Sequence, residues 1–134
     1  MNRFIPVFCL LFSFAALKAQ VRLGYTESQI RKEFPEKIWE RLLDNGEMCI
    51  NSNFRLGEYW YFFSAATNLC YGVTEIPFSN ANLNEQVEYN NRHYVVTSET
   101  SWTVYQEDGG IFYIKLVYLD AMKKNVFNHT YLKQ

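Results

Sequence analysis

Five consecutive aromatic residues, YWYFF, limit what this chain can fold into more than any other segment. Aromatic side chains favour strands, where successive side chains point to opposite faces of the sheet. A strand here places Tyr59, Tyr61 and Phe63 on one face. Trp60 and Phe62 then lie on the other face. We expect one of these two rows to be buried against helices.

The aromatic run belongs to a predicted antiparallel meander. Aromatic residues make up 18% of the sequence, a composition that suits strands. Three apolar segments, 48–50, 59–63 and 69–76, are separated by the turn-prone residues Asn53, Gly57 and Asn68. Short connections between such segments predict strands that run back and forth beside one another.

The C-terminal half also contains strand patterns. Residues 102–106 and 111–119 predict a hairpin across Asp108, Gly109 and Gly110. Residues 94–97 predict a short strand, and 126–127 an added edge strand. In the long strand, the row with Lys115 is interrupted by a charge, so we expect the other row to face the helices. That row consists of Phe112, Ile114, Leu116 and Tyr118.

Helices are predicted at three places. In LGYTESQIRKEF, Thr26 is a suitable N-cap and Gln29 completes a capping box, with Tyr25 and Ile30 spaced as a hydrophobic staple. Apolar residues at 38, 39, 42 and 43 have the spacing of a second, short helix, and the segment ANLNEQVEYNNR (81–92) that of a third. We expect Trp39 and Trp102 to lie in the core.

These elements predict an α+β fold: a two-layer sandwich with helices packed on one face of an antiparallel sheet of five or six strands. Residues 20–134 are long enough for one core and too short for two domains. No internal repeat at a solenoid period is recognisable. We therefore expect a single domain.

The N-terminus predicts export from the cytoplasm. Arg3 precedes an apolar run of about 14 residues, too short to span a bilayer, and Ala19 lies at a suitable cleavage position. We expect residues 1–19 to be a signal peptide and the chain to be periplasmic or secreted, without a membrane span after cleavage. Cys9 lies within the apolar run between bulky neighbours, a poor position for lipid attachment.

Charge excludes a class of partner. The full chain has 13 basic and 14 acidic residues, a net charge of −1. Loss of Arg3 and Lys18 with the signal peptide leaves 11 basic against 14 acidic residues, or about −3. Binding to a phosphate backbone requires a basic surface. The sequence therefore predicts no nucleic-acid binding.

Cys49 and Cys70 remain after cleavage, in a compartment that permits disulfides. No C-x-x-C motif indicates redox chemistry. Two alternatives stay open: a Cys49–Cys70 disulfide, or two unpaired, buried cysteines on neighbouring strands.

No motif indicates a catalytic, cofactor or metal site. P-loop, dinucleotide-binding and G-x-S-x-G motifs are absent from the sequence. His93 and His129 lack ligand spacing, and His93 is better explained as the end of a helix. Glu85 and Glu88 are three apart on a predicted helix, whereas a glycosidase pair must face each other across a sugar. We expect no catalytic residue, no cofactor and no metal.

The aromatic run is the best candidate for a binding site, because exposed aromatic patches mark binding surfaces. We predict that Tyr59, Tyr61 and Phe63, together with Tyr71, form a stacking platform. The alternative is that both aromatic rows are covered and serve only as core.

The order of elements also resembles known families. A capped helix (LGYTESQIRKEF), an aromatic meander (EYWYFFSAATNLCYGV), a helix and a hairpin containing Trp102 resemble a group of small exported proteins of unknown function from Gram-negative bacteria. The opening is similar to the SmpA/OmlA assembly lipoproteins and to β-lactamase-inhibitor-like domains, which layer helices on an antiparallel sheet. Those lipoproteins have a lipidated cysteine, and this chain has no cysteine suitably placed for lipidation, so their role is not transferred.

From these observations we predict a non-catalytic binding module of the periplasm or cell exterior. Its partner is expected to be a protein or an envelope component, bound on the outer sheet face or at a sheet edge. The alternative is a small hydrolase-type enzyme whose site is assembled from distant residues.

Overall fold

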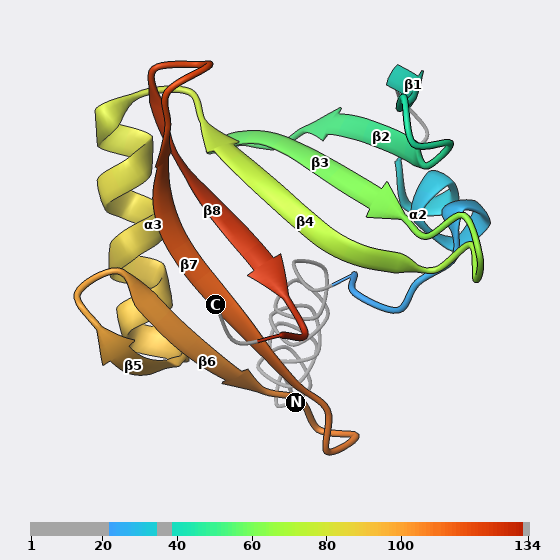
Figure 1. Cartoon of the computed structure of the whole chain (residues 1–134). Coiled ribbons are helices and arrows are strands. Elements are labelled where there is room, and N and C mark those ends of the chain that lie inside the picture. Colours follow the sequence, from blue (N-terminus) through green and yellow to red (C-terminus); the bar gives the residue numbers. More distant parts are fainter. Residues whose placement is uncertain (1–21, 35–38, 133–134) are drawn as a thin grey trace, which may run out of the picture.

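The computed structural model describes residues 22–34 and 39–132 and consists mainly of one antiparallel sheet (Figure 1). Eight strands hydrogen-bond in the order β1-β2-β3-β4-β8-β7-β6-β5. Along the chain the elements are α2 (Glu27–Glu33), β1 (Trp39–Leu42), β2 (Met48–Asn53), β3 (Gly57–Phe63), β4 (Cys70–Pro77), α3 (Asn80–His93), β5 (Val95–Ser98), β6 (Ser101–Tyr105), β7 (Ile111–Leu119) and β8 (Lys124–Thr130).

The predicted α+β sandwich with five or six strands is wrong. The sheet has eight strands, and two short helices accompany it in the described part of the chain. Two errors account for the difference. A segment predicted as a helix is strand β1, and the predicted edge strand at 126–127 is β8, which lies at the centre of the sheet between β4 and β7.

Strand β1 replaces the predicted second helix because it pairs with β2. Leu42 lies opposite Met48, and the chain turns between them at Gly46, which has a φ of 82°. A φ in this range favours glycine. The side chain of Leu42 is 67% exposed, so it belongs to no buried helical face. Ile38 and the side chain of Trp39 lie outside the described residues, as does the predicted signal peptide.

A unit of one helix and four strands occurs twice. The first is α2 with β1 to β4 and the second is α3 with β5 to β8, and the two meet at the antiparallel pair β4 and β8. Val73 lies opposite His129 in this pair. Each helix begins at a hydroxyl N-cap, Thr26 or Ser79, and these caps are 53 positions apart in the sequence. The halves share one sheet instead of stacking as a solenoid would.

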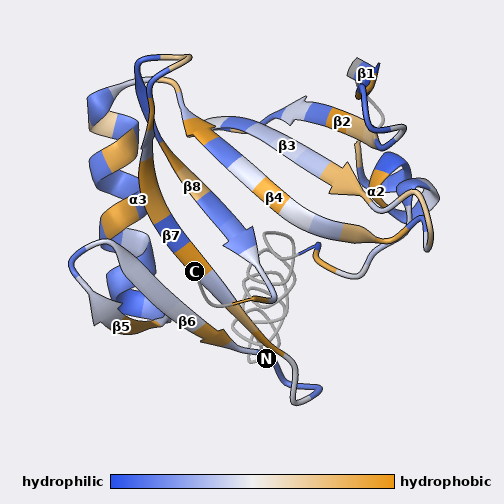
Figure 2. Cartoon of the chain, viewed as in Figure 1, coloured by the Kyte–Doolittle hydropathy of each residue, from blue (hydrophilic) through white to orange (hydrophobic). Residues whose placement is uncertain are grey.

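One face of the sheet forms the core together with the helices. Ile30 of α2 is fully buried in the same cluster as Tyr61, Trp102 and Phe112, and Leu83 of α3 packs against this cluster. Figure 1 places α2 and α3 at opposite ends of the sheet. Apolar and hydrophilic residues alternate along β4 and β7 in Figure 2, as expected for strands with two different faces.

Several local predictions are confirmed. Thr26 and Gln29 form the capping box, with both reciprocal hydrogen bonds present. Helix α3, predicted at 81–92, the short strand β5 and the hairpin of β6 and β7 lie where the sequence predicts them. Trp102 is buried, and its Nε1 donates to Asn91 Oδ1 at 2.8 Å.

Candidate binding surface

The structure corrects which aromatic row can form a surface. Tyr59, Tyr61 and Phe63 are 3%, 0% and 2% exposed and belong to the core, so the prediction that they line an exposed platform is wrong. Tyr71 is 45% exposed. The helices cover the row of Tyr59, because Ile30 and Leu83 pack in the same cluster.

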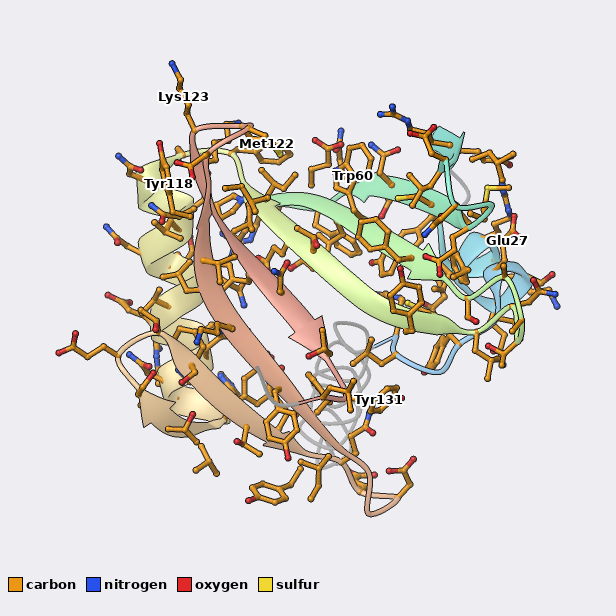
Figure 3. The ribbon with its side chains drawn as sticks, viewed as in Figure 1. Glu27, Trp60, Tyr118, Met122, Lys123 and Tyr131 are labelled. Atoms are coloured by element: carbon orange, nitrogen blue, oxygen red, sulfur yellow. The ribbon has the colours of Figure 1, made fainter. Side chains whose placement is uncertain are left out.

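The opposite row supplies the aromatic surface. Trp60 and Phe62 are half-buried and point away from the helices, on the side that we call the outer face. The rings of Phe62 and Tyr71 lie 6.4 Å apart, and the Tyr71 hydroxyl donates to Glu47 Oε2 at 2.5 Å. Partial burial and this carboxylate raise the pKa of Tyr71 to about 12. Figure 3 shows Trp60 over β3.

Trp60 is unusual because its Nε1 is buried and has no hydrogen-bond partner among the described residues. A buried indole N–H normally has an acceptor, and leaving it unpaired costs free energy. Because this atom is buried, an acceptor of a ligand reaches it only when the Trp60 side chain moves on binding. Trp60 is therefore the side chain on this face with the clearest chemical demand for a partner.

A row of hydrogen-bonding side chains crosses the outer face beside Trp60. Cross-strand pairing places six residues side by side from β2 to β6: Asn51, Trp60, Thr74, Asn128, Lys115 and Ser101. The Thr74 hydroxyl donates to Asn128 Oδ1 at 2.9 Å, and Asn51 Nδ2 donates to Glu58 Oε1 at 2.5 Å. Trp60 is thus the one aromatic residue in this row of polar side chains.

The outer face also carries a small cavity above β6 and β7. It has a volume of about 30 Å³ and is lined by four hydroxyl-bearing residues, one lysine and two core residues: Thr97, Ser101, Tyr113 and Thr130, Lys115, and Trp102 and Ile114. Thr97 Oγ1 donates to Ser101 Oγ at 3.0 Å. This cavity is too small for a whole ligand, but it can receive one polar group of a ligand.

Cys49 and Cys70 do not form a disulfide. Both thiols are free and buried, and β3 lies between their strands. Adjacent strands are about 4.8 Å apart, so residues two strands apart exceed the usual Cα separation of a disulfide. Burial raises the pKa of Cys49 to about 11 and that of Cys70 to about 12. At neutral pH both thiols are protonated and poor nucleophiles.

The core contains a titratable pair that the sequence did not reveal. The His129 imidazole Nε2 lies 3.6 Å from Glu75 Oε2, and both side chains are buried. Tyr59 lies opposite Glu75 in the sheet. This pair is enclosed between sheet and helices, so a substrate has no contact with it.

The other candidate groups have structural partners. Glu85 binds Arg55 and Glu88 binds Arg92, both at the surface. His93 ends α3, where its Nδ1 contacts the carbonyl oxygen of Tyr89 at 2.8 Å. In the described residues, no three His, Cys, Asp or Glu side chains are grouped to hold a metal ion. Neither α2 nor α3 has the length and apolar content needed to cross a membrane.

Comparison with known proteins adds no family. No protein-family model matches this sequence, and neither a curated protein nor a solved structure matches it. The resemblances to the exported proteins, the assembly lipoproteins and the inhibitor-like domains therefore remain sequence-based predictions.

Proposed function

We propose that this chain is a non-catalytic binding protein of the periplasm or cell exterior, and that its partner, a protein or an envelope component, contacts the outer face of the sheet. The observation that carries the proposal is Trp60, a half-buried aromatic residue whose Nε1 is unpaired among the described residues. Tryptophan and tyrosine are enriched at the centres of binding surfaces.

The neighbours of Trp60 support a binding role. Phe62 and Tyr71 extend the aromatic area, and Asn51 and Thr74 flank Trp60 in the cross-strand row. Such a surface offers rings for stacking together with groups that fix orientation. A catalytic role is less well supported, because the buried pair of Glu75 and His129 lies on the opposite, enclosed face.

Affinity capture from the native envelope tests this proposal. The immobilised protein is incubated with envelope extract, and the retained molecules are identified by mass spectrometry. We expect Trp60→Ala and Phe62→Ala to lose a component that the unmodified protein retains. Melting curves of the variants are recorded in parallel, so that loss of binding is separated from loss of folding.

Tyr118→Ala is the matched control. Tyr118 is 56% exposed and lies beside α3, on the other side of the sheet from Trp60 (Figure 3). This variant should retain the component. If folded Trp60→Ala and Phe62→Ala bind it as strongly as the unmodified protein does, the outer face is not the binding surface.

A further inference from the structure

The cavity on the outer face has one charged lining residue, Lys115, amid hydroxyl groups. We propose that this cavity binds a carboxylate group of the ligand. The inference rests on the proposed function, since the cavity belongs to the same face, and it adds a chemical class: the ligand carries an acidic group. Lys115 lies in the cross-strand row that also contains Trp60.

The positive charge of Lys115 favours an anionic group in the cavity. Lys115 is half-buried, and its ammonium group has no ion-pair or hydrogen-bond partner among the described residues. The hydroxyl of Tyr113, two residues earlier on the same strand, is likewise unpaired in the described part of the chain. A partly desolvated cation beside a free hydroxyl donor favours an anionic group, because charge-assisted hydrogen bonds are about twice as strong as neutral ones.

The volume of the cavity suits a carboxylate. A cavity of about 30 Å³ has room for about two water-sized oxygens. A carboxylate has two oxygens and one negative charge, which a single lysine balances. A phosphate group presents three strongly accepting oxygens with a charge of about −1.5 to −2, and its sites usually contain arginines or several backbone N–H groups. The cavity therefore fits a carboxylate better than a phosphate.

The remaining hydroxyls define the shape of the site. On one side, Thr97 Oγ1 donates to Ser101 Oγ, which also lies 2.5 Å from Ser98 Oγ. Thr130 lies opposite Tyr113, and its hydroxyl donates to the carbonyl oxygen of Leu132 at 2.6 Å. The Thr97 and Thr130 hydroxyls donate to internal acceptors, so Lys115 and Tyr113 are the unpaired donors available to the carboxylate among the described residues.

NMR titration of the ¹⁵N-labelled protein with sodium acetate tests the inference. Ionic strength is kept constant by replacing sodium chloride with sodium acetate, so that general screening does not change. We expect saturable shifts confined to the amides of Thr97, Ser101, Tyr113, Lys115 and Thr130. Acetamide has the same shape without the charge and should produce no saturable shift.

Two substitutions and a control identify the donors. Lys115→Gln should weaken acetate binding by about tenfold or more, and Tyr113→Phe by less, since only a neutral hydroxyl is lost. Lys123→Gln is the matched control, because Lys123 projects from the turn between β7 and β8, away from the cavity (Figure 3). Equal responses to acetate and acetamide, or unchanged acetate binding by Lys115→Gln, would overturn the inference.

Further titrations separate the sources of the carboxylate. Glucuronate represents an acidic sugar, N-acetylglycine the C-terminus of a peptide, and inorganic phosphate the rival anion. Tighter binding of glucuronate or N-acetylglycine than of acetate identifies the source of the carboxylate. Tighter binding of phosphate than of acetate contradicts the inference. The proposed function is tested separately, since capture that depends on Trp60 without any acetate site would preserve the binding face and reject only the carboxylate.

Discussion

The imidazole of His129 on β8 lies 3.6 Å from the carboxylate of Glu75 on β4, and both side chains are buried where the two halves of the sheet meet. Neither the Glu75 oxygens nor His129 Nε2 has a hydrogen-bond partner within 3.5 Å among the described residues, and burial together with the Glu75 carboxylate raises the pKa of the neighbouring Tyr59 hydroxyl. Breaking a buried pair of this kind leaves one polar group alone in the core.

We therefore predict that Glu75→Leu and His129→Phe each destabilise the protein by about 3–5 kcal/mol. The double variant should lose much less than the sum, because removal of both polar groups leaves neither unpaired. Urea unfolding of all four proteins measures the coupling. Additive losses would show that the two side chains do not interact.

Arg22 anchors the start of the described chain. Its side chain is 3% exposed and forms an ion pair with Glu33. The guanidinium lies 4.7 Å from the Phe34 ring centre and 5.4 Å from that of Phe54. Cation–π contacts out of water contribute about 2 kcal/mol or more. We predict that Arg22→Ala and Arg22→Lys both lower the melting temperature, because an ammonium lacks the planar guanidinium group that packs against aromatic rings.

Arg92→Ala is the control for Arg22. Arg92 is 71% exposed and pairs with Glu88 one turn earlier on α3. Exposed pairs of this type contribute about 0.5 kcal/mol or less. Equal melting temperatures for Arg22→Ala and the unmodified protein would mean that the aromatic surroundings of Arg22 add nothing to stability.

Export remains a prediction from the N-terminal sequence. Cleavage of a signal peptide after Ala19 should give a secreted or periplasmic product that begins at Gln20. N-terminal sequencing or intact-mass analysis of that fraction measures the first residue directly. A full-length product confined to the cytoplasm would contradict both the compartment and the proposed envelope partner.

Local signals in the sequence predict local structure well. The capping box of Thr26 and Gln29 involves residues three apart, and the turn at Gly109 has a φ of 88°. Both depend on neighbouring residues, so the sequence contains what is needed to predict them. The buried row of β7, with Phe112 and Ile114, was predicted from alternation in the same way.

The errors concern contacts between distant residues. Strand β1 is stabilised by pairing with β2, although its apolar spacing also suits a helix. The central place of β8 depends on pairing Val73 with His129, and nothing local in either strand specifies that contact. The overall fold class was missed for this reason.

The binding surface shows the same limit. Alternation separates Trp60 from Tyr61, but only the position of the helices decides which of them is buried. The polar row depends on register across five pairs of strands, so its members could not be grouped from sequence. The sequence presents Lys115 only as a charge in an apolar row of its strand, because its neighbours in the cavity come also from β5, β6 and β8.

Trp102 and Trp60 should differ in their effect on stability. Trp102 is 1% exposed and packs in the core, so Trp102→Ala should cost about 3–5 kcal/mol. Trp60 is half-buried on the outer face, and Trp60→Ala leaves the core intact. We expect a smaller loss, below about 2 kcal/mol. Thermal melts compare the two, and equal losses would mean that Trp60 is structural rather than available to a partner.

The two cysteines should make stability sensitive to alkaline pH. Burial raises the pKa of Cys49 from 9.0 to about 11 and that of Cys70 from 9.0 to about 12. A raised folded pKa means that the thiol favours folding below the unfolded value of 9.0, and that this contribution is lost as pH rises towards 11 or 12. Each pH unit above 9.0 costs at most about 1.4 kcal/mol per thiol.

Urea unfolding at pH 8 and pH 10 therefore should show a smaller pH effect for Cys49→Ala and Cys70→Ala than for the unmodified protein. A thiol reagent supplies the second measurement, because both thiols are buried and protonated at pH 8. The folded protein should react slowly, and guanidinium should expose two reactive thiols in a chain that begins at Gln20. Rapid reaction of the folded protein, or no reactive thiol after unfolding, would contradict the buried, unpaired state of Cys49 and Cys70.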